Sequence, residues 1–549
     1  MIMEGGYSVF PSARVESDYT LKASCDRQTD MGKDSQTVPG STVINVEMNA
    51  PSGNGNRNVA RKISDAIQNK IFNGTREEGN FTLGCLKLFH TRTRFLIMLL
   101  VLFCLTSIWS NILCFNFALI CMQQSTLDAN GSAVTLEFTP SQKSYLTAAV
   151  AASALLANFF VVSLVNQFGI RTIFSILGLI SAAATSAMPF AIYNGFYYTL
   201  AARMLQGLAF AANFPVIGAF ASKWTYYKQN GLFVSVLVAY VQLSPALSMP
   251  TSGAICASAF GWPAVFYAHG IVATILFITF GALYRNSPGK HPYVGAIELR
   301  KIAVGKTEVN KKDLKNIPYG PILKTAAVWA VWIAALGNFT AVNTLFLFSP
   351  NFLHHVLKFP VRNTGLSASI PPLLQFLVKL LAGFTSDKIR FLSETNKLRL
   401  YNSVAFFGSA ISFIALGFAP VSWAFGCLIL LGLSAGVLGC TTGGFFKAGP
   451  LISKHFSHFV TGNVSLGITL TMLVVPFIVT GLAPDNTAEQ WTHVFFAVAS
   501  VLIVTNLIFI AMCSAEPATW TTDDFSRNMS RNKVHATESS RHNFPAQSG

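Results

Sequence analysis

The sequence predicts an all-α membrane protein in which twelve transmembrane helices form two six-helix bundles related by pseudo-symmetry. The chain has 549 residues, of which 52% are hydrophobic and only 11% are charged, whereas about a quarter of the residues of an ordinary soluble protein are charged. About twelve stretches approach the roughly 20 apolar residues that cross a bilayer. A polar, basic interval divides these stretches into two sets of six.

Hydropathy and loop breaks locate the twelve stretches along the chain. The first six are expected near residues 95–122, 144–166, 172–192, 196–222, 232–256 and 263–284. The second six are expected near residues 325–350, 365–386, 401–419, 421–446, 459–482 and 491–513.

The segments outside the bundles set the orientation in the membrane. Residues 1–94 are mostly polar, and they are predicted to be a disordered cytoplasmic tail. The loop 285–324, between bundles 95–284 and 325–514, is rich in Lys and Arg, which favours the cytoplasmic side. The C-terminal tail, residues 515–549, and the N-terminus are then both cytoplasmic.

Charge and cysteine content exclude several other classes. The formal charge of +16 lies mainly in the tails and alternate loops, so it indicates topology and a lipid bilayer rather than a nucleic-acid partner. The nine cysteines show no metal or redox spacing and mostly lie in apolar runs. We therefore expect no metal site, no cofactor and no disulfide framework. Asn130, in the sequon Asn130-Gly131-Ser132, is a predicted glycosylation site in the first outer loop.

Several short motifs in the fourth to sixth stretches, the central loop and the last stretch resemble one family in combination. They are Arg203-Met204-Leu205-Gln206-Gly207, Asn213-Phe214-Pro215, Ser222-Lys223-Trp224, Met249-Pro250-Thr251-Ser252-Gly253, Gly261-Trp262-Pro263-Ala264-Val265-Phe266-Tyr267, Ser287-Pro288-Gly289-Lys290-His291-Pro292 and Gln490-Trp491-Thr492-His493-Val494-Phe495. From about residue 95 to 520 the chain resembles the anion:cation symporters of the major facilitator superfamily, the group of sialin, the vesicular glutamate carriers and the sodium-phosphate cotransporters. The resemblance implies the major facilitator fold and alternating access. It also implies a small organic anion or phosphate as cargo, driven by protons, sodium or membrane potential.

Three positions depart from the pattern of this family. Cys114 stands where the first helix commonly carries Arg, Asn338 stands where a second basic residue is expected, and Phe210 replaces an acidic residue. The chain therefore resembles a divergent member, and dicarboxylate specificity and standard proton coupling do not carry over. The alternative is a non-transporting receptor or scaffold that retains the carrier fold.

Arg203 is the principal candidate for binding the anion. It lies about two turns inside its helix, where a charge is costly and a guanidinium fork suits carboxylate or phosphate. Gln206 shares its face, and Asn213, Asn116 and Asn338 are further candidate ligands. The alternatives are an Arg203 that snorkels outward or bonds backbone carbonyls, and amides that join neighbouring helices.

The run Ala382-Gly383-Phe384-Thr385-Ser386-Asp387-Lys388-Ile389-Arg390 resembles the cytoplasmic gate motif of the superfamily, and Arg171 belongs to its degenerate first copy. Asp387, Arg390 and Arg171 are the predicted gating residues. Lys379, earlier in the same helix, could face a cavity or reach the headgroups.

The interior of the predicted helices contains no Asp or Glu, so a carboxylate proton relay has no visible carrier. His269 is a candidate for coupling to a proton or sodium, with a packing histidine as the alternative. No phosphate-binding glycine loop or nucleophile elbow occurs, so we expect no enzyme. The plasma membrane and an endolysosomal or vesicular membrane both remain open.

Overall fold

The computed structural model describes residues 21–23, 46–48, 92–122, 138–226, 229–303, 318–389 and 391–521. Most of the predicted N-terminal tail, the loop with Asn130, part of the central loop, Arg390 and most of the C-terminal tail lie outside these residues. Within the first 84 residues, strands β1 (Leu21–Ala23) and β2 (Val46–Met48) pair antiparallel, with Leu21 opposite Met48.

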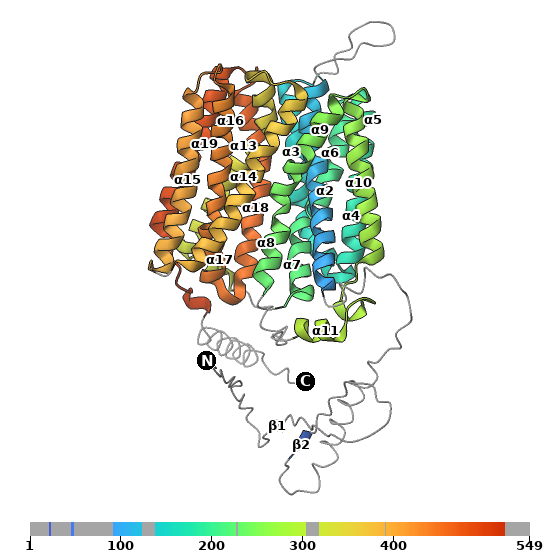
Figure 1. The fold of residues 1–549 in the computed structure, drawn as a ribbon, viewed down its shortest axis with the longest axis vertical. Helices are drawn as coiled ribbons and strands as arrows, with labels where there is room; N and C mark the ends of the chain where they lie inside the picture. The colour runs from blue at the N-terminus through green and yellow to red at the C-terminus, as the bar shows by residue number, and fades with distance from the viewer. Residues whose placement is uncertain are drawn as a thin grey trace, which may run out of the picture. The chain divides into compact units, whose positions relative to one another are not determined.

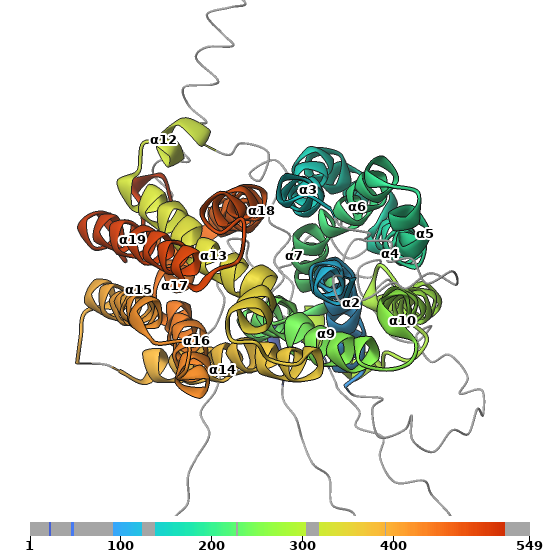
Figure 2. The same ribbon diagram turned by 90° about the horizontal axis from the view of Figure 1, so that it is seen from above.

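The rest of the described chain is helical. The first half comprises α2 (Thr93–Met122), α3 (Pro140–Phe168), α4 (Ile170–Ser186), α5 (Met188–Tyr193), α6 (Phe196–Phe210), α7 (Asn213–Trp224), α8 (Asn230–Val238), α9 (Tyr240–Cys256) and α10 (Gly261–Leu283). The second half comprises α13 (Ala326–Asn351), α14 (Val361–Lys388), α15 (Glu394–Phe418), α16 (Ala424–Leu438), α17 (Phe445–Ser453), α18 (Ser457–Leu482) and α19 (Ala488–Met512). The helices run side by side as two groups, one from each half of the chain (Figures 1 and 2).

Within the described residues, eleven spans, some continuing across a short break, are long and apolar enough to cross a membrane. The third predicted stretch is instead two shorter helices, α4 and α5, which meet at Ala187. Pro189 follows this break at the start of α5, where its missing N–H costs no helical hydrogen bond. The fourth stretch similarly divides into α6 and α7, just before Pro215.

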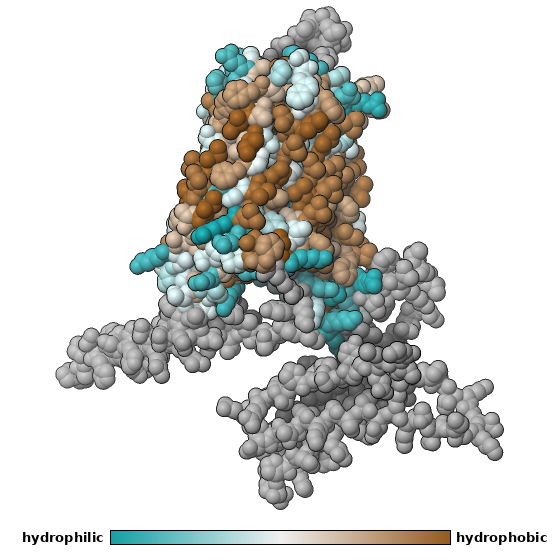
Figure 3. All heavy atoms as spheres, turned by 60° about the vertical axis from the view of Figure 1, so that its left-hand side comes forward, coloured by the Kyte–Doolittle hydropathy of each residue, from teal (hydrophilic) through white to brown (hydrophobic). Residues whose placement is uncertain are grey.

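Apolar side chains cover the outside of the helices. Figure 3 shows a brown apolar band between hydrophilic ends. Phe159, Phe160, Ile275 and Leu381 are among the large apolar residues that are more than half exposed. Such a surface is stable in lipid rather than in water.

The two halves meet along two helix pairs, α9 with α14 and α3 with α18 (Figure 2). The helix ends on the side of the central loop are called inner ends below, and the opposite ends are called outer ends. Near the outer ends of the first pair, a Cβ added to Gly365 would lie 3.0 Å from Cα of Gly253, so the two backbones are in direct contact. In the second pair, Ser144 Oγ donates to Thr480 Oγ1 at 2.6 Å. These contacts hold the outer ends of the halves together.

The central loop packs under the inner end of α2. Helix α11 (Ala296–Ala303) carries Glu298, which is 1% exposed and accepts hydrogen bonds from the backbone N–H groups of Thr93 and Arg94 at 3.2 and 3.0 Å. The carboxylate thus pairs two of the N–H groups that a helix N-terminus leaves free.

His291, earlier in the same loop, packs edge-on against Trp224 at the inner end of α7, with ring centroids 5.5 Å apart. Burial lowers the pKa of His291 from its usual value, and the charge of Arg285 acts in the same direction. The ring therefore packs there as a neutral imidazole at neutral pH, and the loop is fastened to α7 as well as to α2.

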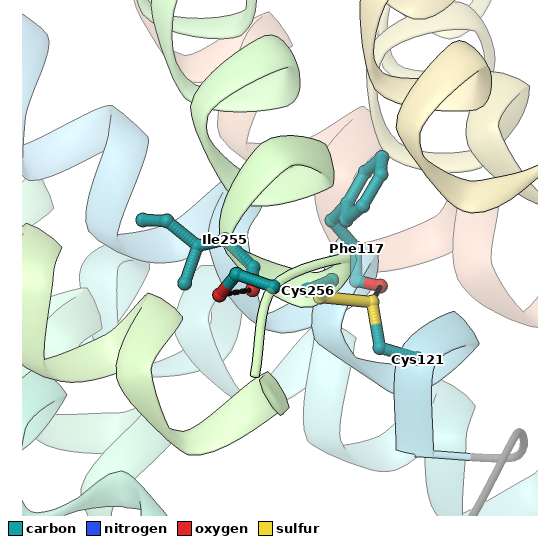
Figure 4. Close-up of a disulfide and its surroundings, with 5 residues drawn as sticks. Phe117, Cys121, Ile255 and Cys256 are labelled. Atoms are coloured by element: carbon teal, nitrogen blue, oxygen red, sulfur yellow. Dashed lines mark hydrogen bonds between the residues drawn. A yellow bond between two sulfur atoms is a disulfide. The ribbon is translucent and has the colours of Figure 1, made fainter. Parts of the chain in front are cut away.

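A disulfide joins the outer ends of α2 and α9, so the expectation of no disulfide was wrong for this pair. Cys121 lies in the last turn of α2 and Cys256 ends α9, with Cα atoms 6.2 Å apart (Figure 4). Two features of the sequence concealed this pairing. Both cysteines lie in apolar runs, and 135 residues separate them. A cysteine at a helix end can reach an oxidising compartment, where disulfides persist.

We expect peptide mapping under non-reducing conditions to recover a Cys121–Cys256 crosslink. Replacing both residues by Ser should lower stability in detergent by about 2–4 kcal/mol, the usual range for a structural disulfide. Cys440→Ser, at a half-buried free thiol, is the control and should change little. Protein purified without reductant that yields no crosslinked peptide would contradict the pairing.

Glu298→Ala should lower the thermal stability of the protein in detergent by about 1–2 kcal/mol, the usual cost of losing a helix N-cap. The reason is that the N–H groups of Thr93 and Arg94 would lose their buried acceptor. Glu516→Ala removes an exposed carboxylate and should be nearly neutral. Equal losses in the two variants would speak against the capping role.

Candidate functional site

Arg203 lies inside the first bundle and is 0% exposed. Its guanidinium Nε donates to the Leu146 carbonyl oxygen of α3 at 3.0 Å, and Nη1 donates to the Ile112 carbonyl oxygen of α2 at 3.1 Å. The ring of Phe115 lies 4.5 Å below the guanidinium carbon. One side chain on α6 therefore joins three helices, and it does so through the backbone carbonyls that the sequence left as an alternative.

Gln206 continues the polar cluster around Arg203. Its Oε1 accepts from Arg203 Nη1 at 2.7 Å, and its Nε2 donates to the Asn111 carbonyl oxygen at 3.0 Å and to Thr185 Oγ1 at 2.8 Å. All of these side chains are fully buried. Arg203 Nη2 has no hydrogen-bond partner among the described residues, so one donor pair of the fork remains unused.

The other three predicted ligands do not join this cluster. Asn116, on α2, accepts from Thr147 Oγ1 at 3.2 Å and lines a cavity of about 70 Å³ between the outer ends of the two halves. Asn213, on α7, is 0% exposed, and its amide lies beside the Tyr240 hydroxyl of α9. Asn338, on α13, belongs to the second half, and its buried amide oxygen has no hydrogen-bond partner among the described residues.

The structure gives Asp387 a specific partner at the inner end of α14. Its Oδ1 lies 2.8 Å from Lys447 Nζ of α17, and the same amine donates to Ser386 Oγ at 3.3 Å. Arg171, in the first half, instead donates from Nε to the Gly281 carbonyl oxygen of α10 at 2.7 Å. Each contact ties neighbouring helices within one half. Arg390 lies outside the described residues.

His269 is half-buried on α10, and its Nδ1 lies 2.8 Å from the carbonyl oxygen of Val265, one turn earlier in the same helix. A contact within one helix is what a packing histidine would make, which was the alternative for His269. It identifies no group with which His269 could exchange a coupling ion.

A polar contact between the halves was not anticipated from the sequence. Gln242 Nε2, in the first turn of α9, donates to Gln375 Oε1, about halfway along α14, at 3.1 Å. Gln242 is near the middle of the span Gly231–Cys256 that α8 and α9 form together. One turn further inward on α14, Lys379 Nζ lies 5.6 Å from the ring centre of Phe446. Two amides and an ammonium within apolar helices were visible in the sequence, but their meeting across the halves was not.

The chain matches known proteins along most of its length. The Major Facilitator Superfamily profile matches residues 95–447. Human sialin (Homo sapiens) is 28% identical over 359 residues, which cover 64% of this chain and 70% of sialin. Mouse sodium-dependent phosphate transport protein 1 (Mus musculus) is 23% identical over 443 residues, which cover 78% of this chain and 95% of that protein.

Solved structures bear on the fold alone. The D-xylose-proton symporter superposes with a TM-score of 0.57 at 15% identity, covering 78% of this chain and 98% of that chain. A bacterial homologue of the human lysosomal transporter Spinster, in an inward-facing and occupied conformation, gives 0.58 at 13% identity, covering 76% and 96%. The predicted fold class is confirmed, and the chain belongs to the Major Facilitator Superfamily.

Proposed function

We propose that the chain is a secondary carrier that moves a small organic anion or phosphate by alternating access. One observation carries the choice of an anion: in the described spans, the formal charges away from the helix ends are positive, Arg203 on α6 and Lys379 on α14. Asp387, Glu394 and Glu489 lie in the first or last turn of their helices. A low-dielectric region with positive charge attracts anions and repels cations.

The contacts between the halves support alternating access as the mechanism. Ser144 with Thr480, and Gly253 with Gly365, join the outer ends without any ion pair. Such neutral contacts are individually weak enough to separate when the halves rock. Asp387 with Lys447 belongs to the inner end, where we place the cytoplasmic gate together with Arg390 and Arg171.

The proposed orientation has both termini in the cytoplasm. The basic central loop favours this side, and the Cys121–Cys256 disulfide at the opposite ends of α2 and α9 favours an oxidising compartment there. That compartment is the cell exterior or the lumen of an endolysosomal or vesicular organelle. We propose Asn130 as a glycosylation site on the same side.

Coupling to a proton or to sodium is part of the proposal, and the relatives support it by their names, because one is a sodium-dependent phosphate transport protein. His269 is the proposed coupling residue. The non-transporting receptor remains as a second function because protein oxygens already engage Arg203.

Purified protein in liposomes should take up at least one of three labelled anions, namely phosphate, a monocarboxylate or a dicarboxylate. We expect uptake to saturate and to respond to a pH gradient or to sodium, because a carrier binds its cargo at a limited number of sites. Thermal stability in detergent is the companion measurement, since a ligand at about 100 times its Kd stabilises by about 2.7 kcal/mol. Stabilisation without uptake would support the receptor instead.

Arg203→Ala should abolish uptake, and Arg203→Lys should retain part of it, because lysine keeps the charge but loses the planar fork. Rates are normalised to folded protein, since the alanine variant loses the buried hydrogen bonds to Leu146, Ile112 and Gln206, and a hydrogen bond to a charged group contributes about 1.5–3 kcal/mol. Arg362→Ala, at an exposed arginine of α14, is the control. Unchanged normalised uptake in Arg203→Ala would remove Arg203 from the site.

A further inference from the structure

Lys379 is a cation within a membrane-spanning helix, and among the described residues its amine faces an aromatic ring. It lies about two-thirds of the way along α14, one turn past Gln375 and before the ion pair at the inner end. Its amine lies 5.6 Å from the ring centre of Phe446, and no carboxylate or hydrogen-bond partner faces it among the described residues. An ammonium in such a position requires an anion or water as its counterpart.

Two amides lie next to this ammonium at the boundary between the halves. Gln375 precedes Lys379 by four residues, so their side chains share one face of α14 about 6 Å apart along the axis. Gln375 Oε1 accepts from Gln242 of α9, which leaves Gln375 Nε2 outside that bond as a donor. Gln242 Oε1 is buried and has no partner.

The remaining wall near Lys379 is aromatic. Phe446 packs on Phe445 with ring centres 4.2 Å apart and on Phe339 of α13 at 6.3 Å. Such rings suit the apolar body of an organic molecule. Arg203 does not add a second charge to this place, because its guanidinium is enclosed between α2, α3 and α6.

We propose that Lys379, Gln375 and Gln242 form an anion subsite between the halves, and that it selects an organic monoanion whose apolar body lies on Phe446. The ammonium balances one negative charge, and the Gln375 amide donates a second hydrogen bond to the same carboxylate. A dianion would leave one charge unbalanced in a low dielectric, and inorganic phosphate would leave the rings without a partner. The inference rests on the proposed anion carrier and names its cargo class.

Because the glutamines come from different halves, the subsite also links binding to movement. Gln242 belongs to α9 in the first half and Gln375 to α14 in the second. A carboxylate that takes the Gln375 donor lies beside a hydrogen bond that must break when the halves separate. Cargo therefore acts beside the described side-chain hydrogen bond that joins α9 to α14.

Benzoate, a monoanion with an apolar body, is the test ligand, with succinate and phosphate as a dianion and an inorganic anion. Thermal stabilisation of the detergent-solubilised protein gives the Kd. We expect benzoate to stabilise the native protein most. Lys379→Gln should raise its Kd by about tenfold or more, because the change removes a charge-assisted hydrogen bond to the carboxylate. Lys379→Arg and Gln375→Ala should have smaller effects.

Lys388→Gln is the matched control. Lys388 lies on the same helix and also packs on a ring, that of Phe384 at 4.2 Å, but it is exposed at the helix end. Its substitution should leave the Kd for benzoate unchanged. Stability without ligand should not fall in Lys379→Gln, because the change removes a charge from an apolar place.

Absence of stabilisation of the native protein by benzoate would overturn the subsite, as would an unchanged Kd in Lys379→Gln or an equal loss in Lys388→Gln. Tighter binding of succinate or phosphate would overturn the monoanion class. These results are separate from liposome uptake. Benzoate binding that depends on Lys379 without any anion uptake would overturn the carrier proposal alone.

Discussion

Every charge inside this protein must be satisfied without help from lipid, and this constraint separates its two interior cations. Arg203 meets it with protein oxygens at Nε and Nη1, from two backbone carbonyls and Gln206, and so it fastens α6 to α2 and α3, while Nη2 stays without a partner among the described residues. Lys379 has an aromatic ring and no oxygen among its described contacts. Protein oxygens therefore already bind Arg203, whereas Lys379 needs an anion or water as its partner.

The first half is fastened at both ends and in its middle, as alternating access requires of a body that moves as a unit. Cys121–Cys256 joins α2 to α9 at the outer end, and Glu298 caps α2 at the inner end. The Arg203 cluster lies between them. Movement is then concentrated at the boundary with the second half, where the contacts described above are hydrogen bonds between uncharged side chains and the packing of Gly253 on Gly365.

Features that depend on local composition could be predicted from the sequence. Contacts between residues that are far apart in the chain could not. Hydropathy located the spans, because a bilayer imposes length and apolarity on each helix separately. The break at Ala187 escaped because Pro189 lies inside an apolar run. Cys121 and Cys256, or Gln242 and Gln375, are 135 and 133 residues apart, and neither pair follows a local pattern. Arg203 was identified as an unusual charge, but its backbone partners on α2 and α3 carry no sequence signal.

The side chains that join α9 to α14 halfway through the protein are glutamines rather than charged residues, and this lowers the free energy needed to separate the two halves. A buried ion pair across the halves would cost several kcal/mol to separate, because each charge would be left without its partner. An amide pair contributes about 1 kcal/mol and can exchange with water or cargo at little cost. If the boundary itself is neutral, the positive charge of Lys379 is available to the cargo rather than to the closure of the halves. Lys379 then binds the cargo, and the glutamine pair joins the halves. A bound anion can therefore move with α14 while the contacts between α9 and α14 rearrange.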